Sequence, residues 1–75
     1  MRVLIKSKKD ITCIAELHYA SIYDTNTLHC IGKDGTSFYI KDIDTSFFYD
    51  IEEMLESLCK NGYITINGTM SATLS

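Results

Sequence analysis

The chain of 75 residues has no proline, no tryptophan and only four glycines. It contains no glycine-rich, proline-rich or repetitive stretch that would mark a linker, so a single domain is expected. Its apolar runs reach only three residues, as in residues 3–5, whereas a membrane-spanning helix needs about 20. Lys6, Lys8 and Lys9 follow the first apolar run instead of preceding it, which does not fit a secretory signal peptide.

Cysteine is also scarce and does not suggest a disulfide scaffold. Cys13, Cys30 and Cys59 are odd in number and widely spaced, which is typical of free thiols in a reducing compartment. We therefore expect a cytoplasmic protein. The alternative that one pair of these cysteines meets in space stays open from the sequence.

Alternation of apolar and polar side chains predicts five strands. It is clearest in residues 11–23, where the odd positions from Ile11 to Tyr19 are apolar and are expected to face the core. Shorter segments predict strands at residues 2–6, 27–32, 36–41 and 63–67. The loop 33–35 fits a hairpin with Gly35 in the left-handed conformation.

The spacing of apolar residues changes to that of a helix at about residues 44–60. Apolar residues recur there at i, i+4, i+7, i+8 and i+11, which is one helix face; they are Phe47, Ile51, Met54, Leu55 and Leu58. Asp44 is a suitable N-cap, and Gly62 suits a left-handed helix end.

The resulting order, β-β-β-β-α-β, predicts an α+β fold in which an antiparallel β-meander carries one amphipathic helix on one sheet face. The domain is expected to span residues 1–68, followed by a frayed tail at 69–75. If the last strand docks beside the first, it is expected to run antiparallel to it. Aligning the inward-facing residues pairs Tyr19 with Cys30, and Cys30 with Phe38.

Charge is divided unevenly along the chain. Residues 1–41 carry six basic and four acidic residues, and residues 42–75 carry one basic and six acidic residues, so balances of +2 and −5 sum to −3. On the predicted helix, Glu52, Glu53, Glu56 and Lys60 lie opposite the apolar stripe. Tyr49 falls among them, with Asp50 at the margin. Such a face is often merely solvated; the alternative is a docking surface for a basic partner, anchored by Tyr49.

The sheet face away from the helix is the second candidate surface. The predicted register brings apolar and aromatic side chains together on it, more than a solvated face requires, and such patches often mark interfaces. The alternative is that a few exposed apolar residues are simply tolerated. The interface candidates are Ile14, His18, Ala20, Ile22, His29, Ile31 and Tyr39.

No motif predicts catalysis, a metal or a cofactor. The predicted alternation sends Cys13 and Cys30 inward but His18 and His29 outward, so they do not converge on zinc or form a Cys–His pair. Residues 32–35 lack the length and following helix of a phosphate-binding loop. Few basic residues and a net charge of −3 disfavour nucleic-acid binding.

These features favour a small non-enzymatic protein-binding module. Phe, Tyr, Met, Ile, Asn and Lys, which have AT-rich codons, total 30 residues, whereas Gly, Ala, Arg and Pro total eight. The profile is similar to that of small acidic proteins with which phages and mobile elements block host machinery. We therefore expect an inhibitor of a basic, nucleic-acid-handling host protein. The alternative function is a structural homo-oligomer, for example a homodimer, that associates through the outer sheet face.

Overall fold

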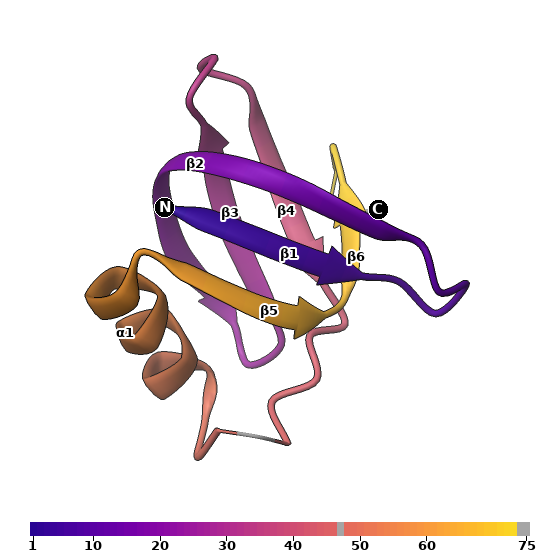
Figure 1. Cartoon of the computed structure of the whole chain (residues 1–75), viewed down its shortest axis with the longest axis vertical. Helices are drawn as coiled ribbons and strands as arrows, with labels where there is room; N and C mark the ends of the chain where they lie inside the picture. The colour runs from indigo at the N-terminus through magenta and orange to yellow at the C-terminus, as the bar shows by residue number, and fades with distance from the viewer. Residues whose placement is uncertain (47, 74–75) are drawn as a thin grey trace.

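A computed structural model describes residues 1–46 and 48–73 and contains one helix and six strands (Figure 1). The expected order is present from the first strand to the fifth, and a further short strand follows. The elements are β1 (Arg2–Lys6), β2 (Thr12–Asp24), β3 (Thr27–Gly32), β4 (Ser37–Lys41), α1 (Ile51–Asn61), β5 (Tyr63–Asn67) and β6 (Thr69–Ser71).

The strands form one mixed sheet in the order β5-β1-β2-β3-β4-β6. The meander from β1 to β4 is antiparallel as predicted, and β6 is antiparallel to β4, but β5 runs parallel to β1. The antiparallel docking expected for the last strand is therefore wrong. Residues 69–71, expected in a frayed tail, pair with β4 instead; residues 74–75 lie outside the described residues.

Closure of the sheet explains the parallel pair. The two outermost strands, β5 and β6, are joined by Gly68 alone, so they act as one bent strand that links both edges of the sheet into a barrel (Figure 1). The Gly68 amide also donates a hydrogen bond to the Lys6 carbonyl at 3.1 Å. When β5 and β6 are counted as one bent strand, the ring contains five strands. An odd number of strands cannot alternate in direction all the way around a closed ring, so at least one neighbouring pair must be parallel.

A bulge in β2 changes which of its residues face the core. Leu17 pairs with Gly32 and Tyr19 with Ile31, so His18 is an extra residue without a partner on β3. Such an insertion bends a strand and shifts its alternation by one. Consequently Ala20, and not Tyr19, pairs with Cys30 and is buried, whereas Tyr19 is 53% exposed. The predicted pair of Cys30 with Phe38 is present.

The helix begins later than predicted because a different aspartate caps it. The Asp50 carboxylate accepts a hydrogen bond from the Glu53 amide at 2.9 Å, so α1 starts at Ile51. Asp44, the predicted cap, instead accepts from the Ser46 amide at 2.9 Å and closes a separate turn. That hydrogen bond lowers the pKa of the Asp44 carboxyl. Phe47, predicted on the helix face, lies outside the described residues.

The end of the helix is as predicted. Gly62 has φ 80° and donates its amide hydrogen bond to the Leu58 carbonyl at 2.8 Å. Glycine adopts this left-handed conformation without a Cβ penalty. Gly35 in the β3–β4 hairpin also has positive φ, at 88°.

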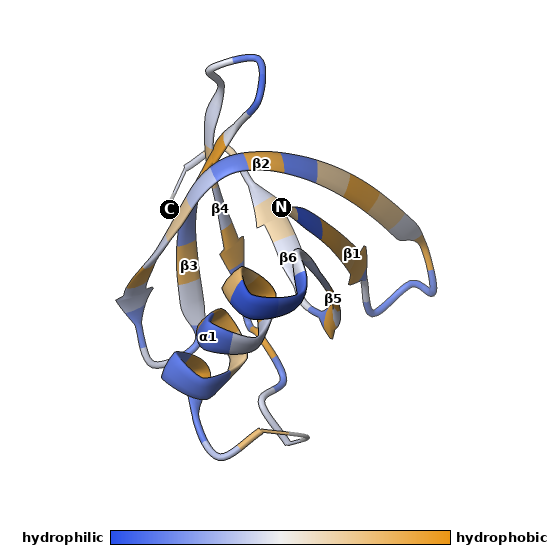
Figure 2. Ribbon diagram, turned by 60° about the vertical axis from the view of Figure 1, so that its left-hand side comes forward, coloured by the Kyte–Doolittle hydropathy of each residue, from blue (hydrophilic) through white to orange (hydrophobic). Residues whose placement is uncertain are grey.

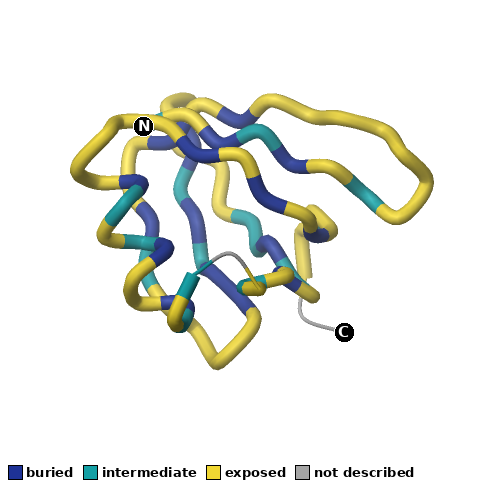
Figure 3. The backbone as a smooth tube through the Cα atoms, turned by 60° about the horizontal axis from the view of Figure 1, so that its bottom comes forward, coloured by how far each residue is buried: buried dark blue, intermediate teal, exposed yellow. Residues whose placement is uncertain are grey.

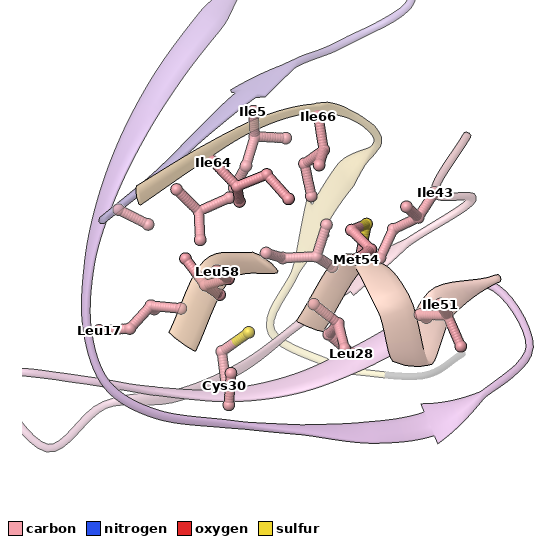
Figure 4. Close-up of a cluster of buried hydrophobic side chains, with 14 residues drawn as sticks. Ile5, Leu17, Leu28, Cys30, Ile43, Ile51, Met54, Leu58, Ile64 and Ile66 are labelled. Atoms are coloured by element: carbon pink, nitrogen blue, oxygen red, sulfur yellow. The ribbon is translucent and has the colours of Figure 1, made fainter. Parts of the chain in front are cut away.

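The core fills the barrel and the space under α1. The hydrophobic side of α1 faces the strands and its hydrophilic side faces outward (Figure 2), and burial follows the same division (Figure 3). Leu58 lies near Leu17 and Cys30, and Met54 lies near Leu28 (Figure 4). The buried cluster comprises Val3, Ile5, Ala15, Leu17, Ala20, Leu28, Cys30, Ile40, Ile43, Ile51, Met54, Leu58, Ile64 and Ile66.

The closing bend gives a first testable prediction. A Cβ at Gly68 would lie 3.1 Å from both Ile40 Cγ2 and the Lys41 carbonyl oxygen. Because both are packed against the bend, we expect Gly68→Ala to lower the free energy of unfolding by about 1–3 kcal/mol, the usual cost of overpacking. Urea denaturation would measure this change. The exposed neighbour provides the control: Thr69→Ala should cost less than about 0.5 kcal/mol, and equal losses at both positions would contradict the packing argument.

Candidate protein-binding surfaces

The outward side of α1 carries the acidic residues predicted there. Tyr49 is 89% exposed just before the helix, and Glu52, Glu53 and Glu56 are also exposed. We call these four residues and the half-buried Asp50 the acidic face. The face lies opposite the buried helix residues Ile51, Met54 and Leu58, so its side chains are not required by the core.

Two members of the acidic face have a structural role as well. The Glu53 amide donates to the Asp50 carboxylate, and the Tyr49 amide donates to the Glu53 carboxylate at 3.0 Å. This reciprocal arrangement resembles a capping box, in which side chains satisfy amides that have no partner within the helix. Asp50 and Glu53 are therefore held in place, whereas Glu52 and Glu56 are exposed on the outward side of the helix.

The carboxylates of the acidic face are not neutralised by basic side chains. Within residues 1–46 and 48–73, the three ion pairs join Arg2 to Glu16, Lys6 to Asp10 and Lys33 to Glu16. All three lie in the first half of the chain. In the same described part, the six acids between Asp42 and Glu56 form no ion pair. Their charge is consequently available to a partner.

The second candidate surface is only partly assembled as predicted. His29, Ile31 and Tyr39 do lie together on the outer side of β3 and β4. Ala20 is buried on the core side, and Ile22 pairs with the core residue Leu28 although it remains 38% exposed. Both placements differ from the prediction, because the bulge at His18 shifts the alternation of β2.

The other two predicted interface residues lie apart from this group. His18 is exposed at the bulge itself. Ile14 is 64% exposed and pairs with Leu4, so it belongs to the outer side of β1 and β5, where Tyr63 also lies. The outer surface of the barrel thus has two parts, not one continuous patch.

Sequence reasoning missed two tyrosines on the outer side of β2. Tyr19 pairs with Ile31, and Tyr23 lies at a second irregularity between Ile22 and Asp24. The Tyr23 and Tyr39 rings meet edge to face, with centroids 5.7 Å apart. We call Tyr19, Tyr23, His29, Ile31 and Tyr39 the aromatic face. Its two extra tyrosines were visible in the sequence, but strict alternation assigned Tyr19 to the core.

Two acidic side chains that line surface hollows, Glu16 and Asp34, are engaged by neighbouring groups. Glu16 lies at 2.6 Å from the Arg2 guanidinium, whose hydrogen bond lowers the pKa of the carboxyl. Asp34 accepts from the Thr36 amide at 2.9 Å, which lowers its pKa too. Both carboxylates are therefore weak bases, unlike the general bases that enzymes tune toward neutral pH.

Groups that hold metals do not converge in the described part of the chain. There, no cluster of three or more His, Cys, Asp or Glu side chains is placed to bind an ion. Residues 1–46 and 48–73 also contain no helix long and apolar enough to cross a membrane.

Comparison with protein-family models, with curated proteins and with solved structures finds no match for this chain.

The cap of α1 gives a second testable prediction. Replacing Asp50 by alanine removes the acceptor for the Glu53 amide, so we expect Asp50→Ala to lower the free energy of unfolding by about 1 kcal/mol, within a range of 0.5–2. Thermal or urea unfolding would measure it. Asp50→Asn keeps a capping oxygen and should retain most of the stability. The neighbouring Glu52→Ala should have a smaller effect; if it costs as much as Asp50→Ala, the capping explanation is wrong.

The three cysteine thiols give a third testable prediction. Cys13 and Cys59 are exposed, but Cys30 has no exposed surface, and burial raises the pKa of its thiol to about 12. Because the thiolate is the reactive form, a soluble disulfide reagent at neutral pH should modify Cys13 and Cys59 in the folded protein. Cys30 should react only after addition of denaturant. Colorimetric titration would count the reacted thiols, and rapid reaction of all three in the native protein would contradict this placement.

Proposed function

We propose that this protein is a non-enzymatic module that binds another protein through the acidic face. The observation that carries the proposal is the group of unpaired carboxylates surrounding Tyr49. These carboxylates form no ion pair within the described residues, although Lys60 lies one turn beyond Glu56 on α1. Their excess negative charge attracts a positively charged surface and speeds encounter. Tyr49 offers a large exposed ring of the type enriched among residues that dominate binding energy.

The fixed positions of the carboxylates support this role. Asp50 and Glu53 are held by hydrogen bonds to the Glu53 and Tyr49 amides, so their charges need little further ordering when a partner docks. Pre-organisation of this kind reduces the entropy lost on binding. Glu52 and Glu56 are exposed on the same side of α1 and supply the adjustable contacts.

The partner class follows from charge complementarity. A protein that binds nucleic acid needs Lys and Arg side chains to neutralise phosphates, so its groove is complementary to a surface rich in carboxylates. We therefore propose a basic, nucleic-acid-handling host protein as the target. Small size, acidity and AT-rich coding favour an inhibitor made by a phage or mobile element. Its place would be the cytoplasm, where reducing conditions keep cysteines free.

Removing two charges from the acidic face tests the proposal. Glu52→Gln with Glu56→Gln leaves the capping residues intact. The matched control, Thr12→Lys with Thr65→Lys, changes net charge by the same amount at exposed positions on the outer side of β2 and β5. Immobilised wild-type and variant proteins would be exposed to lysate of an AT-rich bacterial host, and retained proteins quantified by mass spectrometry. A basic protein should be retained by the wild type and by the control. The amount retained by the glutamine variant should be at least about tenfold lower.

Salt provides the second readout. Retention should fall steeply between 50 and 500 mM salt, because screening weakens contacts between exposed charges. A basic partner held equally well by the glutamine variant, or equally well at high salt, would show that the acidic face is not its docking surface.

A further inference from the structure

The aromatic face has a property that distinguishes it from the rest of the surface. The chain has seven basic and ten acidic residues, yet none of them occupies an outward position between residues 19 and 23, 29 and 31, or 37 and 39. Those positions hold Tyr19, Ser21, Tyr23, His29, Ile31, Ser37 and Tyr39. Charged residues border the aromatic face at Glu16 in β2, before the bulge, and at Asp24 and Lys41 at the strand ends.

The rings on this face hold one another in place. Tyr39 lies between Tyr23, with ring centroids 5.7 Å apart, and His29, at 4.9 Å. His29 Nε2 is in turn 2.7 Å from Ser37 Oγ. Side chains that are already ordered lose little freedom when another surface covers them. Tyr19 and Tyr23 nevertheless remain 53% and 54% exposed, so apolar ring area stays in contact with water.

We infer that a second copy of this chain covers the aromatic face, forming a twofold symmetric dimer. In such an interface the same patch meets itself, so any charge near the axis would face its own like charge. A patch without charged residues avoids this repulsion. A single-stranded nucleic acid would stack on tyrosines but also requires a basic groove, and on these strands only Lys41 borders the face.

The dimer would leave the acidic face free. α1 packs against the inner side of the sheet through Ile51, Met54 and Leu58, and the aromatic face is on the outer side of β2, β3 and β4. Each copy has a net charge of −3, so the two copies repel at long range. Salt screens this repulsion and should therefore strengthen the dimer, whereas it weakens docking through the acidic face.

Sedimentation equilibrium of the full chain tests the inference. Of the aromatic face, only Tyr19 and Tyr23 are more than half exposed, so a small apolar area is covered and we expect a weak dimer with a Kd of about 10–100 µM. Tyr19→Glu should raise the Kd by about 30-fold or more, because it places a buried charge in each half of the interface. Tyr63→Glu is the matched control: Tyr63 is 63% exposed on the outer side of β5, and its replacement should leave the Kd within about threefold.

A measurement on the unaltered protein covers the case in which Tyr19→Glu fails to fold. NMR spectra of the wild type would be recorded on dilution from 1 mM to 20 µM. The amide resonances that shift should belong to the aromatic face and its neighbours in the strands. A wild type that is monomeric at 1 mM overturns the inference. So does a dimer that survives Tyr19→Glu in folded form, or one whose dilution shifts fall on β1 and β5.

Discussion

The fold depends on one bent strand that closes the sheet. β5 and β6 lie at opposite edges of the strand order, and only Gly68 separates them in the chain. Their pairing with β1 and β4 supplies hydrogen-bond partners to both edges, which open sheets leave exposed. It also encloses the inner faces of all strands, so residues as distant in sequence as Val3, Ile40 and Ile66 share one core. A chain of this length has little apolar surface to bury, and closure brings apolar residues from both halves of the chain into one core.

Much of this architecture could be read from the sequence, but not its closure. Local patterns located the strands, because alternation and turn residues are properties of neighbouring positions; Gly35 and Gly62 adopt the expected left-handed conformations. The parallel pair of β1 and β5 depends on the number of strands around the ring, which no local pattern encodes. The same applies to residues 69–71, which are too few to show a strand period and become a strand by pairing with β4.

The candidate surfaces show where pattern reasoning fails in more detail. The acidic face was predictable because helical periodicity is insensitive to a late start: moving the cap from Asp44 to Asp50 leaves Glu52 and Glu56 on the same side. The outer sheet face was not predictable, because one extra residue in a strand moves every later side chain to the opposite face of the sheet. His18 is that residue, and the bulge buries Ala20 while exposing Tyr19. The bulge lies where β2 bends as it passes from its partner β1 to its partner β3 (Figure 1).

The parallel pair also sets an order of events during synthesis. β2, β3 and β4 are joined by short hairpins and can pair as soon as they leave the ribosome, since local contacts form fastest. β1 is made first, yet its partner on one edge is the strand that begins at Tyr63. Until that strand emerges, β1 has one edge without a partner, and the core between β1, β5 and α1 stays open. The folding chain is thus most prone to edge-to-edge association with another chain while β5 is not yet docked.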